Sequence, residues 1–373
     1  MSTKRRTSLK QCIDSLDQLR ELCNISALAG HEDDAIAYMR REMSRYLSDV
    51  RVDKLGNVIG CLPGTSASGP KVMISAHMDE VGFMVRKIEP DGWVRLTRVG
   101  GIPEKSLPGQ RLVLRGSKGD VFGVVGPKSH HLTPPEEKFK VVEINDLTVD
   151  IGAHSKADAE AMGISPGTPV TYHGFFQEMA GGQVAGKALD DRAGCFVLLQ
   201  LVRLLSAKKP PATIYFVASV QEEFNIRGVV TAAYAINPDM LFGLDVSVSC
   251  DTPDLKALAD ICFGGGPVVG HYTFHGRGTL NGLIPNPKLR QYVTDVAARE
   301  GIPLQHSVFL GGLGETSYAA VVKEGIPAVD VAFPARYTHS PIEVGSVPDM
   351  ELMVELLAAA LQGIDSSLDL SRG

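Results

Sequence analysis

The hydrophobic and polar positions of this chain follow two periods, and the change between them divides it into regions. Apolar residues at helical spacing predict helices over 34–47 and 191–205, between Asn286 and Gly301, and from Pro348 onward. Short apolar runs predict buried strands at 50–53, 57–62, 71–76, 213–220, 240–246 and 328–333. Strands that alternate with helices predict an α/β fold, with a mixed, largely parallel sheet sandwiched by helices.

The region between about residues 85 and 174 has a different pattern. Apolar and polar residues alternate over 110–114 and 120–125 around a Gly-Ser-Lys-Gly turn, which predicts a hairpin with one solvated face. One short helix is expected over 155–162, with Ser155 as N-cap and Gly163 as its stop. We therefore expect a small β-rich domain at 85–174, inserted into a catalytic domain made of residues 1–84 and 175–373.

Composition narrows the class of protein. The 373 residues exceed what one core usually supports, and 37 basic against 43 acidic side chains give a net charge of −6 without long runs of either sign. This pattern predicts neither a nucleic-acid nor a membrane surface. Residues 1–17 are basic and polar and do not resemble a signal peptide. The six cysteines form no CxxC pair, so we expect reduced thiols and a cytoplasmic protein.

Five side chains that can bind metals lie where a predicted strand ends or a helix begins: His77, Asp190, Glu223, Asp245 and His339. Loops that leave the carboxyl ends of parallel strands converge on one crevice, so residues far apart in sequence can meet there. Imidazole and carboxylate ligands without thiolates suit Zn²⁺, Co²⁺ or Mn²⁺ in an open, catalytic site. Taken singly, each of the five has a structural alternative, and the hypothesis rests on the whole set.

Neighbouring residues extend this hypothesis. Asp79 follows His77 by two positions and could accept the second N–H of its ring. Asp190 has two oxygens and could bind two cations, although Asp190 or Asp191 could also cap the following helix. In the pair Glu222-Glu223, we expect one residue to bind metal and the other to face the substrate as a general base. A salt-bridged surface pair is the alternative.

Together these segments resemble a known family. They are Ser-Ala-His-Met-Asp-Glu-Val-Gly at 75–82, Gly-Lys-Ala-Leu-Asp-Asp-Arg at 186–192, Gln-Glu-Glu at 221–223, Leu-Asp-Val at 244–246 and Arg-Tyr-Thr-His-Ser-Pro at 336–341, with further matches at 107–111 and 150–153. The chain is similar to the dinuclear-metal aminopeptidases that include glutamyl aminopeptidase and the tetrahedral aminopeptidases.

The resemblance implies a role for each site residue. His77 and Asp245 would bind one metal, Glu223 and His339 the other, and Asp190 would bridge them. Glu222 would be the general base and Asp79 the partner of His77. A cis peptide is also implied between Asp190 and Asp191. The fold would be zinc-peptidase-like, and the insert would be a small β-barrel-like module for dimerisation, with six dimers forming a tetrahedral dodecamer.

The function implied is that of a metal-dependent aminopeptidase, which hydrolyses N-terminal residues from peptides through a water bridging two divalent metal ions in each subunit. The metals would be Zn²⁺, with Co²⁺ or Mn²⁺ as alternatives. The free α-amino group would be recognised by a metal or by an acid such as Glu315. Other hypotheses are a metal-dependent carboxypeptidase or deacylase, a glycosidase that uses paired acids, and a non-catalytic assembly protein.

One segment departs from the family pattern. Where the family usually has a Gly-Thr-Asp-Ala-type run, this chain has Gly-Leu-Gly-Glu-Thr-Ser at 312–317. The predicted metal ligands are intact, so we expect the departure to affect the preference for the first residue of the substrate.

Overall fold

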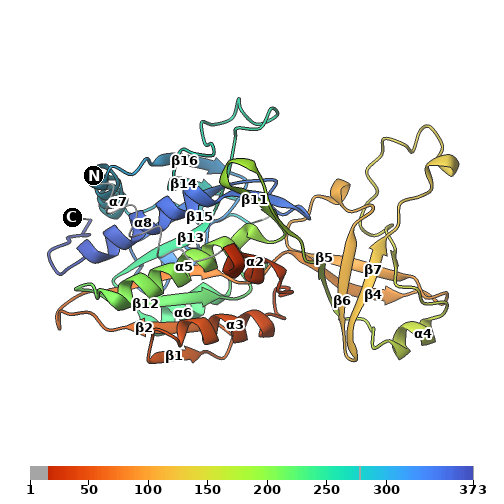
Figure 1. Cartoon of the computed structure of the whole chain (residues 1–373), viewed down its shortest axis with the longest axis horizontal. Coiled ribbons are helices and arrows are strands. Elements are labelled where there is room, and N and C mark those ends of the chain that lie inside the picture. Colours follow the sequence, from red (N-terminus) through yellow and green to blue (C-terminus); the bar gives the residue numbers. More distant parts are fainter. Residues whose placement is uncertain (1–15, 277–278, 373) are drawn as a thin grey trace.

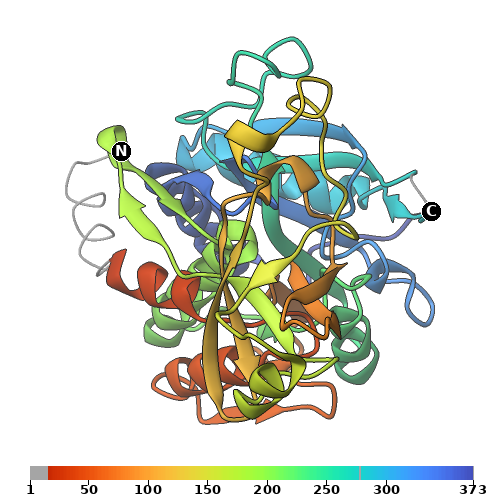
Figure 2. The ribbon, with the colours of Figure 1, turned by 90° about the vertical axis from the view of Figure 1, so that its right-hand side faces the viewer.

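The computed structural model describes residues 16–276 and 279–372. It contains a mixed sheet with helices on both faces and a closed barrel that projects from one end of the sheet (Figure 1). Figure 2 looks at the molecule from the barrel side, with the helices and sheet behind it. The predicted fold class, including a barrel inserted into an α/β domain, is confirmed.

The centre of the large sheet is parallel. Four strands lie side by side there in the order β12 (Thr213–Ser219), β3 (Lys71–His77), β13 (Met240–Val248) and β17 (Ala328–Arg336). Their carboxyl ends therefore share one edge of the sheet, as the sequence predicts.

Antiparallel strands extend this centre on both sides. On the β12 side lie β2 (Val58–Leu62) and β1 (Asp49–Val52). On the β17 side lie β18 (Glu343–Ser346), β11 (Gln183–Gly186) and β10 (Phe176–Glu178), and a branch is formed by β14 (Val268–Phe274), β15 (Gly282–Leu283) and β16 (Gln305–Leu310).

Helices cover the two faces of the sheet unequally. The larger hydrophobic core joins one face to α2 (Leu16–Asn24), α3 (Asp33–Met43), α5 (Leu189–Ala207), α7 (Pro287–Glu300) and α8 (Val347–Gly363). On the opposite face α6 (Gly228–Ile236) packs on β12, together with the 3₁₀ turn η4 (Ala319–Val321). Strands that are buried on both faces need nearly continuous apolar residues. The apolar runs in the sequence therefore predict the central strands.

The barrel closes in the order β4 (Gly82–Ile88), β5 (Val94–Val99), β8 (Val149–Asp150), β7 (Gly119–Val125), β6 (Arg111–Gly116) and β9 (Pro169–Tyr172). Its interior is a separate apolar core. The segments between its strands contain α4 (Lys156–Ala161) and the 3₁₀ turns η1 (Glu104–Ser106) and η2 (His130–Leu132). A further 3₁₀ turn, η3 (Ala180–Gly182), lies between β10 and β11 of the large sheet. The domain boundaries at 84/85 and 174/175 stay predictions, and β4 begins at Gly82.

The predicted helix ends are of mixed accuracy. Asn286 caps α7 by accepting the backbone N–H groups of Lys288 and Leu289, and Gly301 ends it with φ 68°. By contrast, α3 ends at Met43, four residues before the predicted end. The chain turns there because the backbone N–H groups of Tyr46 and Leu47 both donate to the Met43 carbonyl at 3.0 Å. The Tyr46 side chain is 44% exposed and lies outside the apolar face.

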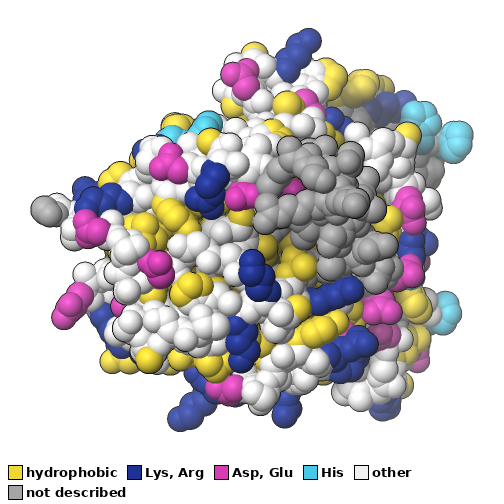
Figure 3. Space-filling model, turned by 60° about the vertical axis from the view of Figure 1, so that its left-hand side comes forward, with side chains coloured by type: hydrophobic (Ala, Val, Ile, Leu, Met, Phe, Trp, Pro, Cys, Tyr) yellow, Lys and Arg dark blue, Asp and Glu magenta, His cyan; other side chains and the backbone are white. Residues whose placement is uncertain are grey.

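The surface agrees with the mixed charge of the sequence. On the face in Figure 3, basic and acidic side chains are interspersed with small apolar patches. Five cysteines are free thiols in the part of the chain that the structure describes, whereas Cys12 and most of the basic N-terminal segment lie outside it. Over the same residues, no helix has the length and apolar character needed to span a bilayer.

Candidate metal centre

His77 is the last residue of β3, and both of its ring nitrogens face carboxylates. Its Nε2 lies 3.1 Å from Asp190 Oδ1 and 3.8 Å from Glu222 Oε2. Its Nδ1 lies 3.6 Å from Asp79 Oδ1, on the side away from Asp190. The His77 side chain is 1% exposed, so its contacts with these carboxylates are shielded from solvent.

Asp79 also organises the Glu222-Glu223 turn. Its two oxygens accept the backbone N–H groups of Glu222 at 2.9 Å and Glu223 at 3.0 Å. The pair does not continue β12 in extended form, because Gln221 has φ 56° and the chain turns after Ser219. Both glutamate side chains therefore enter the cluster, rather than pointing apart as they would in extended chain.

Asp190 lies between two histidines, with one oxygen near each. Its Oδ1 is 3.1 Å from His77 Nε2, and its Oδ2 is 3.3 Å from His339 Nε2. Asp191 caps the helix, which was the alternative role suggested for this pair. Its Oδ1 accepts the Gly194 backbone N–H near the start of α5. The peptide bond between Asp190 and Asp191 is cis, as the family resemblance implies.

The remaining two predicted ligands come from neighbouring strands. Asp245 lies in β13, and its Oδ2 accepts the Glu315 backbone N–H at 3.2 Å. His339 follows β17, and its Nε2 lies 3.3 Å from Glu223 Oε1. The other ring nitrogen, Nδ1, lies 2.6 Å from the Gly101 carbonyl, so the segment that follows β5 of the barrel also contacts the site.

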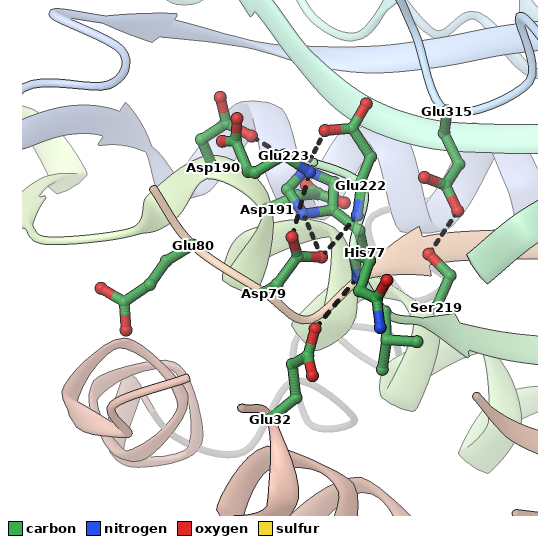
Figure 4. A network of polar contacts seen from close by, with 12 residues as sticks. Glu32, His77, Asp79, Glu80, Asp190, Asp191, Ser219, Glu222, Glu223 and Glu315 are labelled. Atoms are coloured by element: carbon green, nitrogen blue, oxygen red, sulfur yellow. Dashed lines mark hydrogen bonds and ion pairs between the residues drawn. The ribbon is translucent and has the colours of Figure 1, made fainter. Parts of the chain in front are cut away.

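All of the predicted site residues thus meet in one place. Three sets of donor atoms lie close enough to hold an ion: His77, Asp190 and Asp245; Asp190, Glu223 and His339; and His77, Glu222 and Glu223. Figure 4 shows Asp190, Glu222 and Glu223 gathered on one side of His77 and Asp79 on the other. We refer to His77, Asp190, Glu222, Glu223, Asp245 and His339 as the metal cluster.

The metal cluster has more acidic than basic groups. Burial raises the pKa of Glu222 and of Asp245 well above the usual range, and neighbouring carboxylates raise both further. Burial also raises the pKa of Glu223 to about 7, against the opposing effect of His339. Burial alone would lower the pKa of His77, but Glu222 and Asp190 outweigh it and raise that pKa.

This excess of negative charge provides a test of whether a metal fits. Buried carboxylates without compensating positive charge are costly, and they are normally paired or bound to cations. The donor set consists of imidazoles and carboxylates, which are ligands that Zn²⁺, Co²⁺ and Mn²⁺ accept. By charge and by chemistry, the residues present fit divalent cations.

Two further acids support the metal cluster, and sequence reasoning did not single out the first. Glu343, in β18, accepts the backbone N–H groups of Asp190 at 2.9 Å and His339 at 2.6 Å. Glu315 is fully buried and accepts a hydrogen bond from Ser219 Oγ at 2.6 Å. Glu315 does not line the cavity beside the metal cluster, so its position does not favour contact with a substrate's α-amino group. The only feature of the sequence that could have indicated a role for Glu343 is its position as an acid between the apolar residues Ile342 and Val344.

A cavity of about 740 Å³ opens beside the metal cluster. Asp190, Glu222, Glu223, Asp245 and His339 all line it. Residues of β14, β16 and the loop at 311–314 also line it, with Val268, Phe309 and Leu313 among the apolar ones. A small molecule or the end of a peptide can therefore lie against the metal cluster.

A buried set of imidazoles and carboxylates, facing a cavity at the carboxyl edge of a mixed sheet, defines the class of metal-dependent hydrolases. Residues 56–356 match the M42 glutamyl aminopeptidases, and the chain belongs to this family. It is 42% identical over 343 residues to SgcX of Escherichia coli (strain K12), with 92% of each chain covered. The predicted aminopeptidase class is confirmed at the level of the family.

Solved structures agree with the family assignment. An aminopeptidase from the archaeon Desulfurococcus kamchatkensis superimposes with a TM-score of 0.89 at 33% identity, with 97% of this chain and 98% of that chain covered. The TET1 peptidase of Pyrococcus horikoshii, which can assemble into a tetrahedron or a large octahedral shell, gives a TM-score of 0.83 at 27% identity and covers 94% of this chain and 99% of its own. Both similarities span the barrel as well as the sheet.

Proposed function

We propose that this protein releases N-terminal residues from peptides by hydrolysis at a dinuclear metal centre. The observation that carries the proposal is the position of Asp190, whose two oxygens lie 3.1 Å and 3.3 Å from two different histidines. His77 and Asp245 would hold one cation, and Glu223 and His339 the other, with Asp190 shared. When bound, the cations would polarise the scissile carbonyl and lower the pKa of a water molecule.

Glu222 is the general base in this proposal. It lines the cavity, and its Oε2 lies 3.8 Å from His77 Nε2, beside the proposed ligands. Its carboxylate would take the proton of the attacking water and then deliver it to the departing amine. Asp79 would hold Glu222 in position, because it accepts the Glu222 backbone N–H at 2.9 Å.

The test separates catalysis from metal binding. Glu222→Gln should retain both metals by elemental analysis and should lose turnover by about 10²- to 10⁴-fold, the usual contribution of a general base. Glu223→Gln is the matched control, because it alters the adjacent residue and should lose metal. If Glu222→Gln kept full turnover, the role of Glu222 as base would be wrong.

A substrate panel separates the other hydrolase hypotheses. Free-amine aminoacyl anilides should be cleaved, whereas N-acylated and C-terminal substrates should not, which distinguishes an aminopeptidase from a deacylase or carboxypeptidase. A chromogenic glycoside tests the glycosidase hypothesis, which requires acids on opposite sides of a sugar bond and no metal. Activity should disappear with chelator and return with Zn²⁺, Co²⁺ or Mn²⁺, which also identifies the preferred metal.

We also propose that the chain forms a homo-oligomer through its barrel. The barrel and its loops expose several large apolar side chains, among them Phe122 at 64%, Leu132 at 76% and Phe139 at 95%. Exposed apolar side chains mark a surface that associates when they form one contiguous patch, and the proposal takes these residues to belong to such a patch. Light scattering should give a mass that is a multiple of 39.9 kDa, and a monomer at micromolar concentration would overturn the proposal.

A further inference from the structure

Asp330 is a buried carboxylate in the cavity that the proposed mechanism does not use. It lies in β17, is 6% exposed and lines the same cavity as the metal cluster. Its Oδ1 accepts a hydrogen bond from Thr316 Oγ1 at 2.7 Å. Its Oδ2 is buried and has no hydrogen-bond partner among the described residues. A buried acceptor in this state is costly unless a donor reaches it.

The alternation of β17 directs Asp330 toward the cavity. Val329 and Val331 belong to the large core on one face of the sheet, whereas Asp330 and Ala332 line the cavity on the other. In the neighbouring strand β13, Gly243 is the partner of Asp330 and Asp245 is the partner of Ala332. Asp330 therefore lies one strand and two residues from the metal ligand Asp245, a separation of about 8 Å between Cα atoms.

Two glycines make room for this carboxylate. A Cβ atom at Gly314 would lie 2.3 Å from Asp330 Oδ2, and one at Gly243 would lie 2.3 Å from Oδ1. Any other residue at either position would displace the Asp330 side chain. Gly314 also lines the cavity, and it belongs to the run at 312–317 where this chain departs from the family pattern.

Asp330 has no Lys or Arg as counter-charge in the described part of the cavity wall, because neither is among the described residues that line the cavity. Burial raises the pKa of Asp330 to about 6, so the group is mostly ionised above neutral pH. The apolar side chains of Val268, Phe309 and Leu313 line the same space and could cover an aliphatic stem.

We propose that Asp330 is a specificity-determining residue whose carboxylate binds the cationic side chain of an N-terminal Lys or Arg. The inference rests on the proposed function, since the scissile bond must lie at the metal cluster for the first side chain to reach Asp330. A separation of about 8 Å from Asp245 suits a side chain with several methylene groups. The aliphatic stem would lie along the apolar wall and the charged end would meet the carboxylate.

Two other roles for Asp330 predict different kinetics. If Asp330 bound the α-amino group, its loss would weaken every aminoacyl substrate equally. If it only held the loop at 311–317 through Thr316, its loss would lower stability and affect every substrate in the same way. Recognition of a cationic side chain affects basic substrates alone.

The first measurement uses the unmodified holoenzyme. The anilides of lysine and norleucine share a four-carbon stem, and only lysine carries an ammonium group. We expect kcat/KM for lysine to exceed that for norleucine by roughly 10-fold or more, in line with a hydrogen bond to a charged group. Equal values, or a preference for norleucine, would overturn the inference without need of a variant.

The second measurement compares Asp330→Asn with wild type on Lys, Arg, Leu and Ala anilides. Asn keeps the size of the side chain and can still accept from Thr316. We expect kcat/KM for Lys and Arg to fall by roughly 10- to 100-fold and that for Leu and Ala to stay within roughly threefold. Asp295→Asn, an exposed carboxylate on α7, is the control for the lost charge. A uniform loss over all four substrates would overturn the inference. If the wild-type enzyme cleaved none of them, the proposed function would be wrong and this inference with it.

Discussion

The buried carboxylate of Glu80 lies close in sequence to residues of the metal centre, and its charge is balanced differently from the charge of the metal cluster. Glu80 follows Asp79, and Lys187 precedes Asp190 by three residues. Lys187 Nζ donates to both oxygens of Glu80, at 2.6 Å and 2.7 Å. Arg192 adds a second cation at 3.6 Å. Positive charge from the chain itself neutralises Glu80.

The metal cluster has no such internal balance. Its four carboxylates, Asp190, Glu222, Glu223 and Asp245, face two histidines, and neither Lys nor Arg is bonded to them among the described residues. The comparison shows that burial of acids by itself does not mark a functional site. A functional site is indicated by several buried carboxylates that face one another without Lys or Arg. Such a group becomes neutral only by taking up protons or by binding cations.

The largest expected effect comes from breaking the balanced group. Lys187→Met should lower the free energy of unfolding by about 3–5 kcal/mol, because Glu80 is then buried with most of its compensation removed. Urea denaturation of the metal-loaded protein measures it. The double variant Glu80→Gln, Lys187→Met is the control and should recover most of the loss. A loss below about 1 kcal/mol would mean that Arg192 alone compensates Glu80.

Removing the metal should have the next largest effect. A chelator should abolish activity and lower stability by about 2.7 kcal/mol if the free metal was at 100 times its dissociation constant. Differential scanning calorimetry with and without added Zn²⁺ measures the change. Asp245→Asn is the matched variant: it should lose the cation that His77 and Asp245 would hold, so added metal should stabilise it less than wild type. Without metal its stability should exceed that of wild type, because a buried acid that is costly to ionise is gone. A metal-free Asp245→Asn protein less stable than metal-free wild type would contradict the uncompensated charge.

The third effect is the dependence of the metal-free protein's stability on pH. Burial raises the pKa of Glu223 to about 7 and that of Glu343 to about 8, above the value of an exposed glutamate. Between the unfolded and folded pKa values the native state binds more protons, so stability falls as pH rises. The slope is about 1.4 kcal/mol per pH unit for each proton bound in excess.

Chemical denaturation at pH 6, 7 and 8 in the presence of chelator checks this dependence. The metal-loaded protein is the control, since bound cations favour the ionised carboxylates and should remove the decline. A metal-free protein that is as stable at pH 8 as at pH 6 would show that the carboxylates are compensated in another way.

Much of the fold is predictable from the chain because buried strands need apolar runs. The strands β3, β12, β13 and β17 are apolar almost throughout, so their ends are visible in the sequence, and polar residues at those ends stand out. The helix ends with a specific cap, such as Asn286 of α7, are also predictable. The end of α3 and the presence of β14 and β16 are not, because no cap or period distinguishes them from their surroundings. For α6, the cap at Asn237 (φ 52°) marks where the helix ends, but no apolar period marks the helix itself.

The sequence by itself determined which side chains could hold metal, because each such residue lies where a predicted strand ends or a predicted helix begins. Tertiary structure alone decided how their charges combine. The alignment of β17 with β13 places Asp330 beside Gly243, and the return of β18 places Glu343 under Asp190 and His339. The electrostatic energy of these carboxylates depends on their burial and on their distances from other charges. Both are set by strands that are remote in sequence, so the local sequence pattern does not predict them.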